Sequence, residues 1–175
     1  MGGDPQLTFH EATLRRYYEA QGYKPIAINE GLAVVFSELE DQNFTGIGIS
    51  CGGGMCNVTL AYLSIPSIMF SITKGGDYID RSAAAVVNEA ATRVRVIKEE
   101  GLDLLRNAKD KYEKALQIYY EDLVETLIEA LRRSISSAEK LPRSERPIPI
   151  VLAGGTSKPK AVSYTHLTLP TILRV

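Results

Sequence analysis

Apolar and polar residues follow two different periods along this chain, and they predict both helices and strands. Apolar residues recur every three or four positions, as in helices with one buried face, in residues 8–21, 29–39, 81–98 and 102–136. Short apolar runs of strand length, bordered by turn residues, occupy residues 25–28, 45–50, 58–63, 67–73 and 150–152. Asn29 precedes the second helical stretch and is a residue type that caps helices. This order predicts an α/β fold with a mixed sheet flanked by helices.

The composition is that of a globular domain, and it excludes several classes of function. The 175 residues include 20 Lys and Arg against 21 Asp and Glu, so the net charge is −1. This balance gives no bulk attraction for nucleic acid or for anionic membranes. No run approaches the roughly 18 apolar residues of a membrane span, and the polar start of the chain has no signal-peptide pattern. We therefore expect a cytoplasmic protein with no transmembrane segment that binds no nucleic acid.

The strongest candidate for chemistry is a glycine triplet between two predicted strands. Gly52, Gly53 and Gly54 follow the run that ends at Ser50, and the next predicted strand is residues 58–63. Bare glycines allow positive φ and leave backbone N–H groups open, so they can form a nest for an anion such as phosphate. The alternative is a tight β-hairpin in which the glycines serve only the turn.

Two further glycine segments stand at the ends of predicted strands. Residues 154–156, Gly-Gly-Thr, follow the last apolar run and would offer N–H donors at the positive end of a helix dipole. Residues 74–77, Lys-Gly-Gly-Asp, precede the third helical stretch. Taken alone, each segment is more typical of an ordinary turn. Cys51 and Cys56 have no further ligands nearby for zinc, so we expect free, buried thiols.

The three glycine segments, taken together and in this order, resemble the motifs of the actin-like ATPase superfamily, which includes MreB-type actins and DnaK-type chaperones. The resemblance covers about residues 20–160. Residues 24–37 resemble the family's connecting segment, and residues 50–57 resemble its second phosphate motif. Residues 75–80 resemble the start of its outer subdomain, and residues 150–156 resemble its adenosine motif.

This resemblance implies that residues 1–160 are the C-terminal lobe of a two-lobed ATPase domain. The implied fold is ribonuclease H-like, a five-stranded type of mixed sheet flanked by helices. Residues 81–140 would form a largely helical outer subdomain. Residues 161–175 change composition abruptly where a helix should follow, so we expect them to be a non-native tail. The natural protein would then continue beyond both ends of this chain.

The resemblance also implies a site for ATP or ADP with Mg²⁺. The phosphates would be held by Gly52, Gly53, Gly54 and Met55. The adenosine would lie against Gly154, Gly155, Thr156, Arg95 and Lys98. Glu30 would stand near the hinge as the catalytic acid, and Ser50 would face the metal through a water molecule.

The sequence departs from the family pattern where that pattern has polar or acidic groups. Ser50 replaces the leading Asp, Met55 replaces a Thr, and Asn57 replaces the closing acid. Neither Ser50 nor Asn57 carries the charge that helps to hold Mg²⁺ and to orient water. The family's first phosphate motif has no equivalent before the connecting segment. We therefore expect this chain to be inactive on its own.

Three functions remain open on this basis. The first is an ATP-binding lobe whose hydrolysis is coupled to lobe closure in the full-length protein. The second is a nucleotide-binding scaffold or filament subunit with little or no hydrolysis. The third is an α/β interaction module that binds no nucleotide. The expected partners are the missing N-terminal lobe and either further copies of the chain or a client protein.

Overall fold

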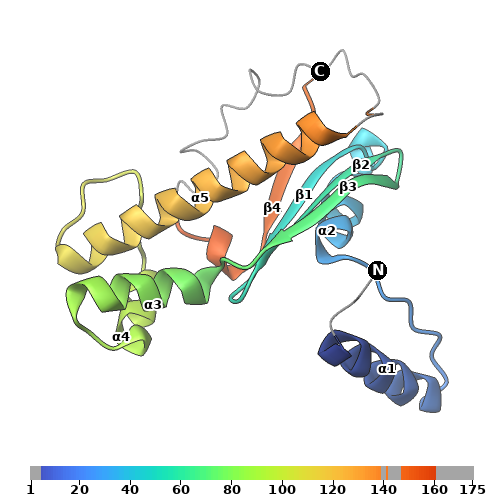
Figure 1. Ribbon diagram of the computed structural model, residues 1–175, viewed down its shortest axis with the longest axis horizontal. Helices are drawn as coiled ribbons and strands as arrows, with labels where there is room; N and C mark the ends of the chain where they lie inside the picture. Colours follow the sequence, from blue (N-terminus) through green and yellow to red (C-terminus); the bar gives the residue numbers. More distant parts are fainter. Residues whose placement is uncertain (1–4, 139–140, 142–146, 161–175) are drawn as a thin grey trace.

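The computed structural model describes residues 5–138, 141 and 147–160, and its elements alternate between helices and strands (Figure 1). The first half contains α1 (Pro5–Ala20), α2 (Glu30–Glu38), the 3₁₀ turn η1 (Glu40–Gln42), β1 (Gly46–Cys51), β2 (Cys56–Tyr62) and β3 (Ile65–Ile72). The second half contains α3 (Gly76–Val87), α4 (Ala91–Glu99), α5 (Lys111–Ser137), β4 (Ile150–Ala153) and the 3₁₀ turn η2 (Gly155–Ser157). The α/β class predicted from the sequence is confirmed.

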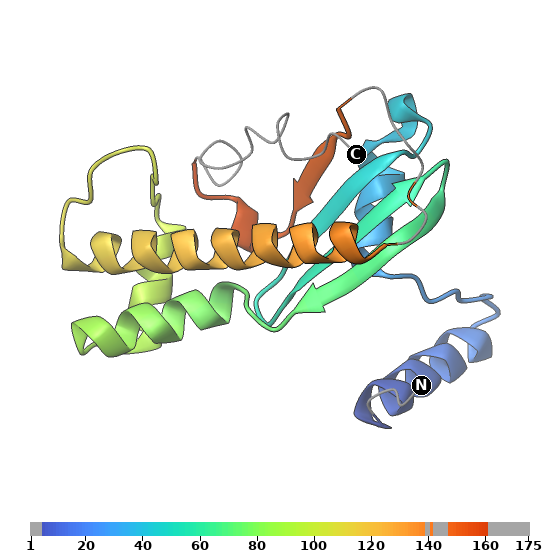
Figure 2. The same ribbon diagram turned by 45° about the horizontal axis from the view of Figure 1, so that its top comes forward.

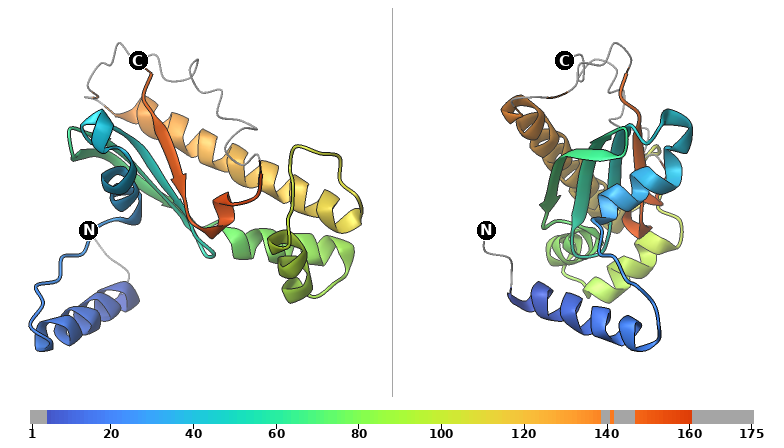
Figure 3. Two further views of the ribbon diagram at one scale, coloured as in Figure 1. Left: turned by 180° about the vertical axis from the view of Figure 1, so that it is seen from behind. Right: turned by 90° about the vertical axis from the view of Figure 1, so that its right-hand side faces the viewer.

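The strands form one mixed sheet in the order β3-β2-β1-β4. β1 pairs antiparallel with β2, β2 pairs antiparallel with β3, and β1 pairs parallel with β4. The two views of Figure 3 show α5 on one face of this sheet and α2 on the other. The described residues thus form four strands and not the predicted five, because residues 25–28 pair with no strand.

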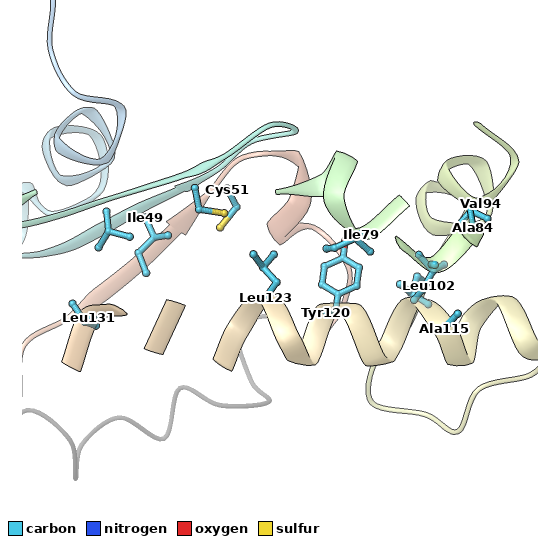
Figure 4. Close-up of a cluster of buried hydrophobic side chains, with 14 of the residues drawn as sticks. Ile49, Cys51, Ile79, Ala84, Val94, Leu102, Ala115, Tyr120, Leu123 and Leu131 are labelled. Atoms are coloured by element: carbon cyan, nitrogen blue, oxygen red, sulfur yellow. The ribbon is translucent and has the colours of Figure 1, made fainter. Parts of the chain in front are cut away.

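The main core lies between the sheet and α5, and it continues into α3 and α4 (Figure 4). Alternate residues of β1 face α5, and the last of these is Cys51. From α5, Tyr120, Leu123 and Leu131 reach toward the sheet and the outer helices. The apolar residues that recur every three or four positions in this segment therefore form a core-facing helix surface, as their period predicts.

α2 packs on the opposite face of the sheet at very short range. Asn29 caps this helix as predicted, because its side chain accepts hydrogen bonds from the N–H groups of Gly31 and Leu32. A Cβ atom on Gly48 would collide with the carbonyl oxygen of Gly31, and one on Gly31 would lie 2.9 Å from the carbonyl oxygen of Gly48. Two glycines facing each other therefore set the distance between helix and sheet.

The outer helical part lies beyond one end of the sheet (Figure 2). The single helix predicted for residues 81–98 is wrong in its bounds, because α3 ends at Asn88 in the left-handed conformation, φ 54°, and α4 begins at Ala91. The helix predicted from residue 102 also begins later. Asp110 caps it by accepting hydrogen bonds from the N–H groups of Tyr112 and Glu113, so residues 102–110 form a connection instead.

The N-terminal segment contributes nothing to this core. α1 lies apart from the sheet and from α3, α4 and α5, as Figures 1 and 2 show. The strand predicted at residues 25–28 is an unpaired connection in which Ile26 is 80% exposed. Pro25 has no N–H to donate, and none of the strands that the structure describes pairs with this segment. Among the described residues, no helix has the length and apolar character needed to cross a membrane.

Candidate functional site

The three glycine segments predicted from the sequence meet at the carboxyl ends of β1 and β4. The first segment is the turn between β1 and β2, which the N–H of Gly52 closes by donating to the carbonyl oxygen of Met55 at 3.0 Å. The hydroxyl of Thr156 donates to the carbonyl oxygen of Gly52 at 2.8 Å. The N–H of Gly76 donates to the same oxygen at 3.0 Å. The carbonyl group of Gly52 thus joins all three segments.

Where the three segments touch, the glycines have no room for a Cβ atom. At the exposed end of the turn between β1 and β2, this restriction is weaker. A Cβ on Gly75 would lie 2.5 Å from the carbonyl oxygens of Gly52 and Gly53. Gly154 has φ +97°, and a Cβ there would collide with the carbonyl oxygen of Cys51. None of the three glycines of the triplet uses the positive φ that glycine allows. Gly54 in particular has open space around its Cβ position.

The turn between β1 and β2 presents free donors on its exposed side. Within the described residues, the N–H groups of Gly53 and Gly54 donate to no backbone or side-chain acceptor, and both glycines are exposed. Adjacent free N–H groups attract anions. A Cβ on Gly53 would lie 3.4 Å from the carboxylate of Asp77, so this acid lies beside the turn.

A cleft of about 850 Å³ opens at this junction. Its lining includes Gly53, Gly76, Gly155 and Thr156 from the three glycine segments. Its basic lining residues are Arg95, Lys98, Arg106, Lys158 and Lys160, and its acidic ones are Asp77, Asp80, Glu99 and Asp103. A polar cleft of this size is large enough for a nucleotide.

Three ion pairs fix the basic wall of the cleft, and two of them involve the buried carboxylate of Asp80. Asp80 is 1% exposed, and its carboxylate contacts the ammonium of Lys98 at 2.7 Å and the Nε of Arg95 at 3.0 Å. Arg95 also contacts Asp77 at 2.6 Å. The hydrogen bond to Asp80 raises the pKa of Arg95 further, and this guanidinium is cationic in any case. The predicted adenosine residues Arg95 and Lys98 thus do lie with the glycine segments, held by acids of the third motif.

Thr156 and Gly155 lie in a different local structure from the one predicted. The strand β4 is followed by η2, a 3₁₀ turn of three residues, and not by a longer helix. Such a turn is too short to produce a helix dipole at the cleft. Thr156 is buried, and its side chain is occupied by the hydrogen bond to Gly52. It holds the turn in place as well as lining the cleft.

Tyr120 lines the floor of the cleft, and sequence reasoning did not identify it. Its hydroxyl is buried and has no hydrogen-bond partner among the described residues. Burial raises the pKa of Tyr120, and the nearby charge of Asp80 adds to the effect, so the hydroxyl stays protonated. In the sequence, Tyr120 is one of the apolar residues that recur every three or four positions in the segment that forms α5. Nothing in its neighbouring sequence distinguishes it from the other apolar residues of that segment.

Glu30 lies with Ser50 and Asn57 on the α2 face of the sheet. Its carboxylate accepts hydrogen bonds from the hydroxyl of Ser50 at 3.1 Å and from the Nδ2 of Asn57 at 2.9 Å. Asn57 in turn accepts a hydrogen bond from the hydroxyl of Ser71 at 2.5 Å. The sequence placed Glu30 and Ser50 near the same site, and the structure brings them into direct contact. Their roles in catalysis and metal binding stay predictions.

The described residues do not form a binding site for a resident metal ion. They contain no group of three His, Cys, Asp or Glu side chains that is placed to hold one. The hydroxyl of Ser50 already donates to Glu30, and the acids beside the glycine turn are paired with Arg95 and Lys98. The predicted Mg²⁺ is therefore not supported by these side chains.

Solved structures of low sequence identity share this fold. EutJ, an ethanolamine utilization protein from Carboxydothermus hydrogenoformans, has a TM-score of 0.58 and 15% identity over 78% of this chain and 44% of its own. A non-polymerising MamK mutant bound to AMPPNP has a TM-score of 0.59 and 17% identity over 75% of this chain and 48% of its own. PilM in a type IV pilus biogenesis complex with PilN has a TM-score of 0.53 and 16% identity over 73% of this chain and 34% of its own.

These three proteins have the actin-like ATPase fold, so the predicted actin-like lobe is confirmed at the level of the fold. The chain spans less than half the length of each of them. No curated protein matches the sequence. The family model named Volactin matches residues 3–166. This match enters the segment 161–175, predicted to be non-native, which lies outside the described residues. The chain belongs to the Volactin family, and its described part has the fold of one actin-like lobe.

Proposed function

We propose that this lobe binds ATP in the cleft at the carboxyl ends of β1 and β4. The observation that carries the proposal is the joining of three glycine segments at the carbonyl group of Gly52, beside a basic wall of Arg95 and Lys98. Glycines allow a ligand to approach the backbone closely, and free N–H groups and fixed cations favour a polyanion. AMPPNP in the MamK structure supports the proposal by analogy of fold only.

In this proposal each predicted residue has a defined task. The free N–H groups of Gly53 and Gly54 bind the terminal phosphates, with Met55 closing the turn behind them. Gly155 and Thr156 lie along the adenosine, and Gly154 keeps that segment close to β1. Lys98 and Arg95 contribute positive charge on the opposite wall. Mg²⁺ enters only as a companion of the triphosphate, because Mg²⁺ is commonly held by substrate phosphates and water.

Thermal unfolding with and without ATP tests the proposal. A ligand that binds only the folded state raises the free energy of unfolding, by about 2.7 kcal/mol at one hundred times its dissociation constant. Gly54→Asp should abolish this stabilisation, since its carboxylate repels phosphate. Gly54→Asn is the matched neutral control and should retain it. Both side chains have room at this position. Unchanged stabilisation in Gly54→Asp, or none in the wild type, would contradict phosphate binding at the turn.

The second wall of the site would come from another lobe. The structural neighbours are more than twice as long as the matched region, and this cleft is open on one side. We propose that the N-terminal lobe closes over the nucleotide, and that α1 and residues 21–29 lead toward it. Hinge closure around a ligand is a common way to couple binding to movement. A client protein or further copies of the chain would then bind either the open or the closed arrangement of the two lobes.

A nucleotide-binding scaffold or filament subunit is the second candidate function, and the hydrogen bonds of Glu30 favour it. Ser50 and Asn57 both donate to the same oxygen of Glu30, the predicted catalytic acid. Protein donors thus already occupy this oxygen of Glu30, which leaves it less available to accept a hydrogen bond from an attacking water. Phosphate release by the two-lobed protein separates the candidates. A scaffold shows ATP-dependent pelleting with equal, negligible turnover in wild type and Glu30→Gln. An ATPase shows turnover that Glu30→Gln removes while ATP binding persists.

A further inference from the structure

Two cysteines stand opposite each other at the base of the glycine turn. Cys51 is the last residue of β1, Cys56 is the first residue of β2, and the two are paired in register. Both belong to the core on the α5 face of the sheet, at 2% and 0% exposure. Figure 4 shows Cys51 directed into this core. The two thiols therefore share one face of the sheet directly beneath the turn.

The backbone pattern places these thiols at the shortest cross-strand spacing. The N–H of Gly52 donates to the carbonyl oxygen of Met55, which makes that pair a hydrogen-bonded one. Pairs alternate along an antiparallel ladder, so Cys51 and Cys56 form a non-hydrogen-bonded pair, with Cα atoms about 4.5 Å apart. A disulfide requires a Cα separation of about 4.4–6.8 Å. The strands therefore already hold both residues at a distance that a disulfide can span.

We infer that Cys51 and Cys56 are an oxidisable dithiol, a modification site that a small-molecule disulfide converts into a bond between the two strands. The thiolate of one cysteine attacks a sulfur of the small disulfide, forms a mixed disulfide and releases one small thiol. The second cysteine attacks the protein sulfur of that mixed disulfide, loses its proton and releases the second small thiol. The protein loses two hydrogen atoms, and one small disulfide becomes two thiols.

The thiols differ in their readiness to react. The hydrogen bond between them lowers the pKa of Cys51, while the same bond and burial raise the pKa of Cys56. Cys51 is therefore the attacking thiolate, since the thiolate and not the thiol is the nucleophile. Cys56 then stands opposite the mixed disulfide, and the second step is intramolecular, so it is much faster than capture of another small molecule.

Access to the buried pair comes through the turn above it. Gly53, Gly54 and Met55 are exposed, and the end of the hairpin can open without unfolding the sheet. The new bond would constrain Cys51, whose carbonyl oxygen lies against Gly154, and its neighbour Gly52, whose carbonyl oxygen receives Thr156 and Gly76. Oxidation would thus act on the backbone that joins the three glycine segments.

Intact-mass measurement of the folded chain with oxidised glutathione, without nucleotide, tests this inference. The wild type should lose two hydrogen atoms and carry no glutathione. Cys56→Ser should stop at one stable glutathione adduct on Cys51, and Cys51→Ser should react several-fold more slowly than Cys56→Ser. The same chain unfolded in urea shows that the reagent is active.

Two results would overturn the inference. One is a wild-type chain in which each cysteine carries its own glutathione. The other is a folded wild-type chain that stays reduced under conditions that oxidise the urea-unfolded chain, which would show that the pair is an inert part of the core. Because no nucleotide is present, both outcomes are independent of whether the cleft binds ATP.

Discussion

Individual glycines in the site have different physical roles, although they are the same type of residue. Gly154 combines a positive φ with close contact to the carbonyl group of Cys51, whereas Gly54 has an ordinary φ and open space. The sequence could predict that residues 52–54 form an open turn after a strand. It could not predict which glycine is sterically required, because that depends on backbone atoms about a hundred residues away.

Substitution at these two positions should therefore lower stability to very different degrees. Gly154→Ala is expected to lower the free energy of unfolding by more than about 2 kcal/mol, since its backbone conformation is essentially restricted to glycine. Gly54→Ala should change it by less than about 1 kcal/mol, and it is the control. Urea unfolding followed by circular dichroism measures both. Equal effects at the two positions would show that the contact with Cys51 does not constrain the fold.

Helix ends depend on single residues, and some of these could be identified in the sequence. Asn29 was predicted as a cap and is one, because a cap acts on the N–H groups that directly follow it. Asn88 was not predicted as the end of α3, since the apolar period continues through it into α4. Asp110 likewise stands inside a charge-rich run whose period is helical. Periodicity locates the buried face of a segment, but it does not show where the helix breaks.

The contact between the β3 end and α5 predicts a dependence of stability on pH. Asp122 on α5 accepts hydrogen bonds from Lys74 and Tyr78, both at 2.7 Å. Burial alone would raise the pKa of Asp122, but these hydrogen bonds from Lys74 and Tyr78 outweigh it, so the net pKa is lowered. A carboxylate whose pKa is lower in the folded state contributes stability above its unfolded pKa, about 3.9. That contribution is lost as the pH falls through the folded value.

Asp122→Asn should therefore remove part of the acid sensitivity. Between about pH 5 and pH 3 the wild type should lose more unfolding free energy than the variant, and their difference should shrink as the pH falls. Glu129→Gln, at an exposed ion pair of α5 with Arg133, is the matched control and should follow the wild type. Parallel acid profiles for wild type and Asp122→Asn would show that the contact contributes no pH-dependent stability.

At the scale of the whole molecule, the order of motifs predicted the lobe better than any motif alone. Each glycine segment alone was more typical of an ordinary turn, but their joint order resembled the motifs of the actin-like ATPase superfamily. The parallel pairing of β1 with β4 is what brings residues 52 and 156 together. Tyr120 could not be predicted as part of the site, because only the packing of α5 beneath the cleft places it there.

The separation of α1 from the rest of the lobe leads to a prediction about stability. Residues 9–20 of α1 are all exposed, with Phe9 and Tyr17 at 68% and 62%. A chain without residues 1–22 should therefore unfold with a free energy within about 1 kcal/mol of the parent. Leu123→Ala, in the centre of the core, should lower the same quantity by about 2–5 kcal/mol. A loss on removing α1 as large as that of Leu123→Ala would mean that the helix packs against the lobe in solution. An unchanged value would mean that α1 adds no stabilising contact to this lobe.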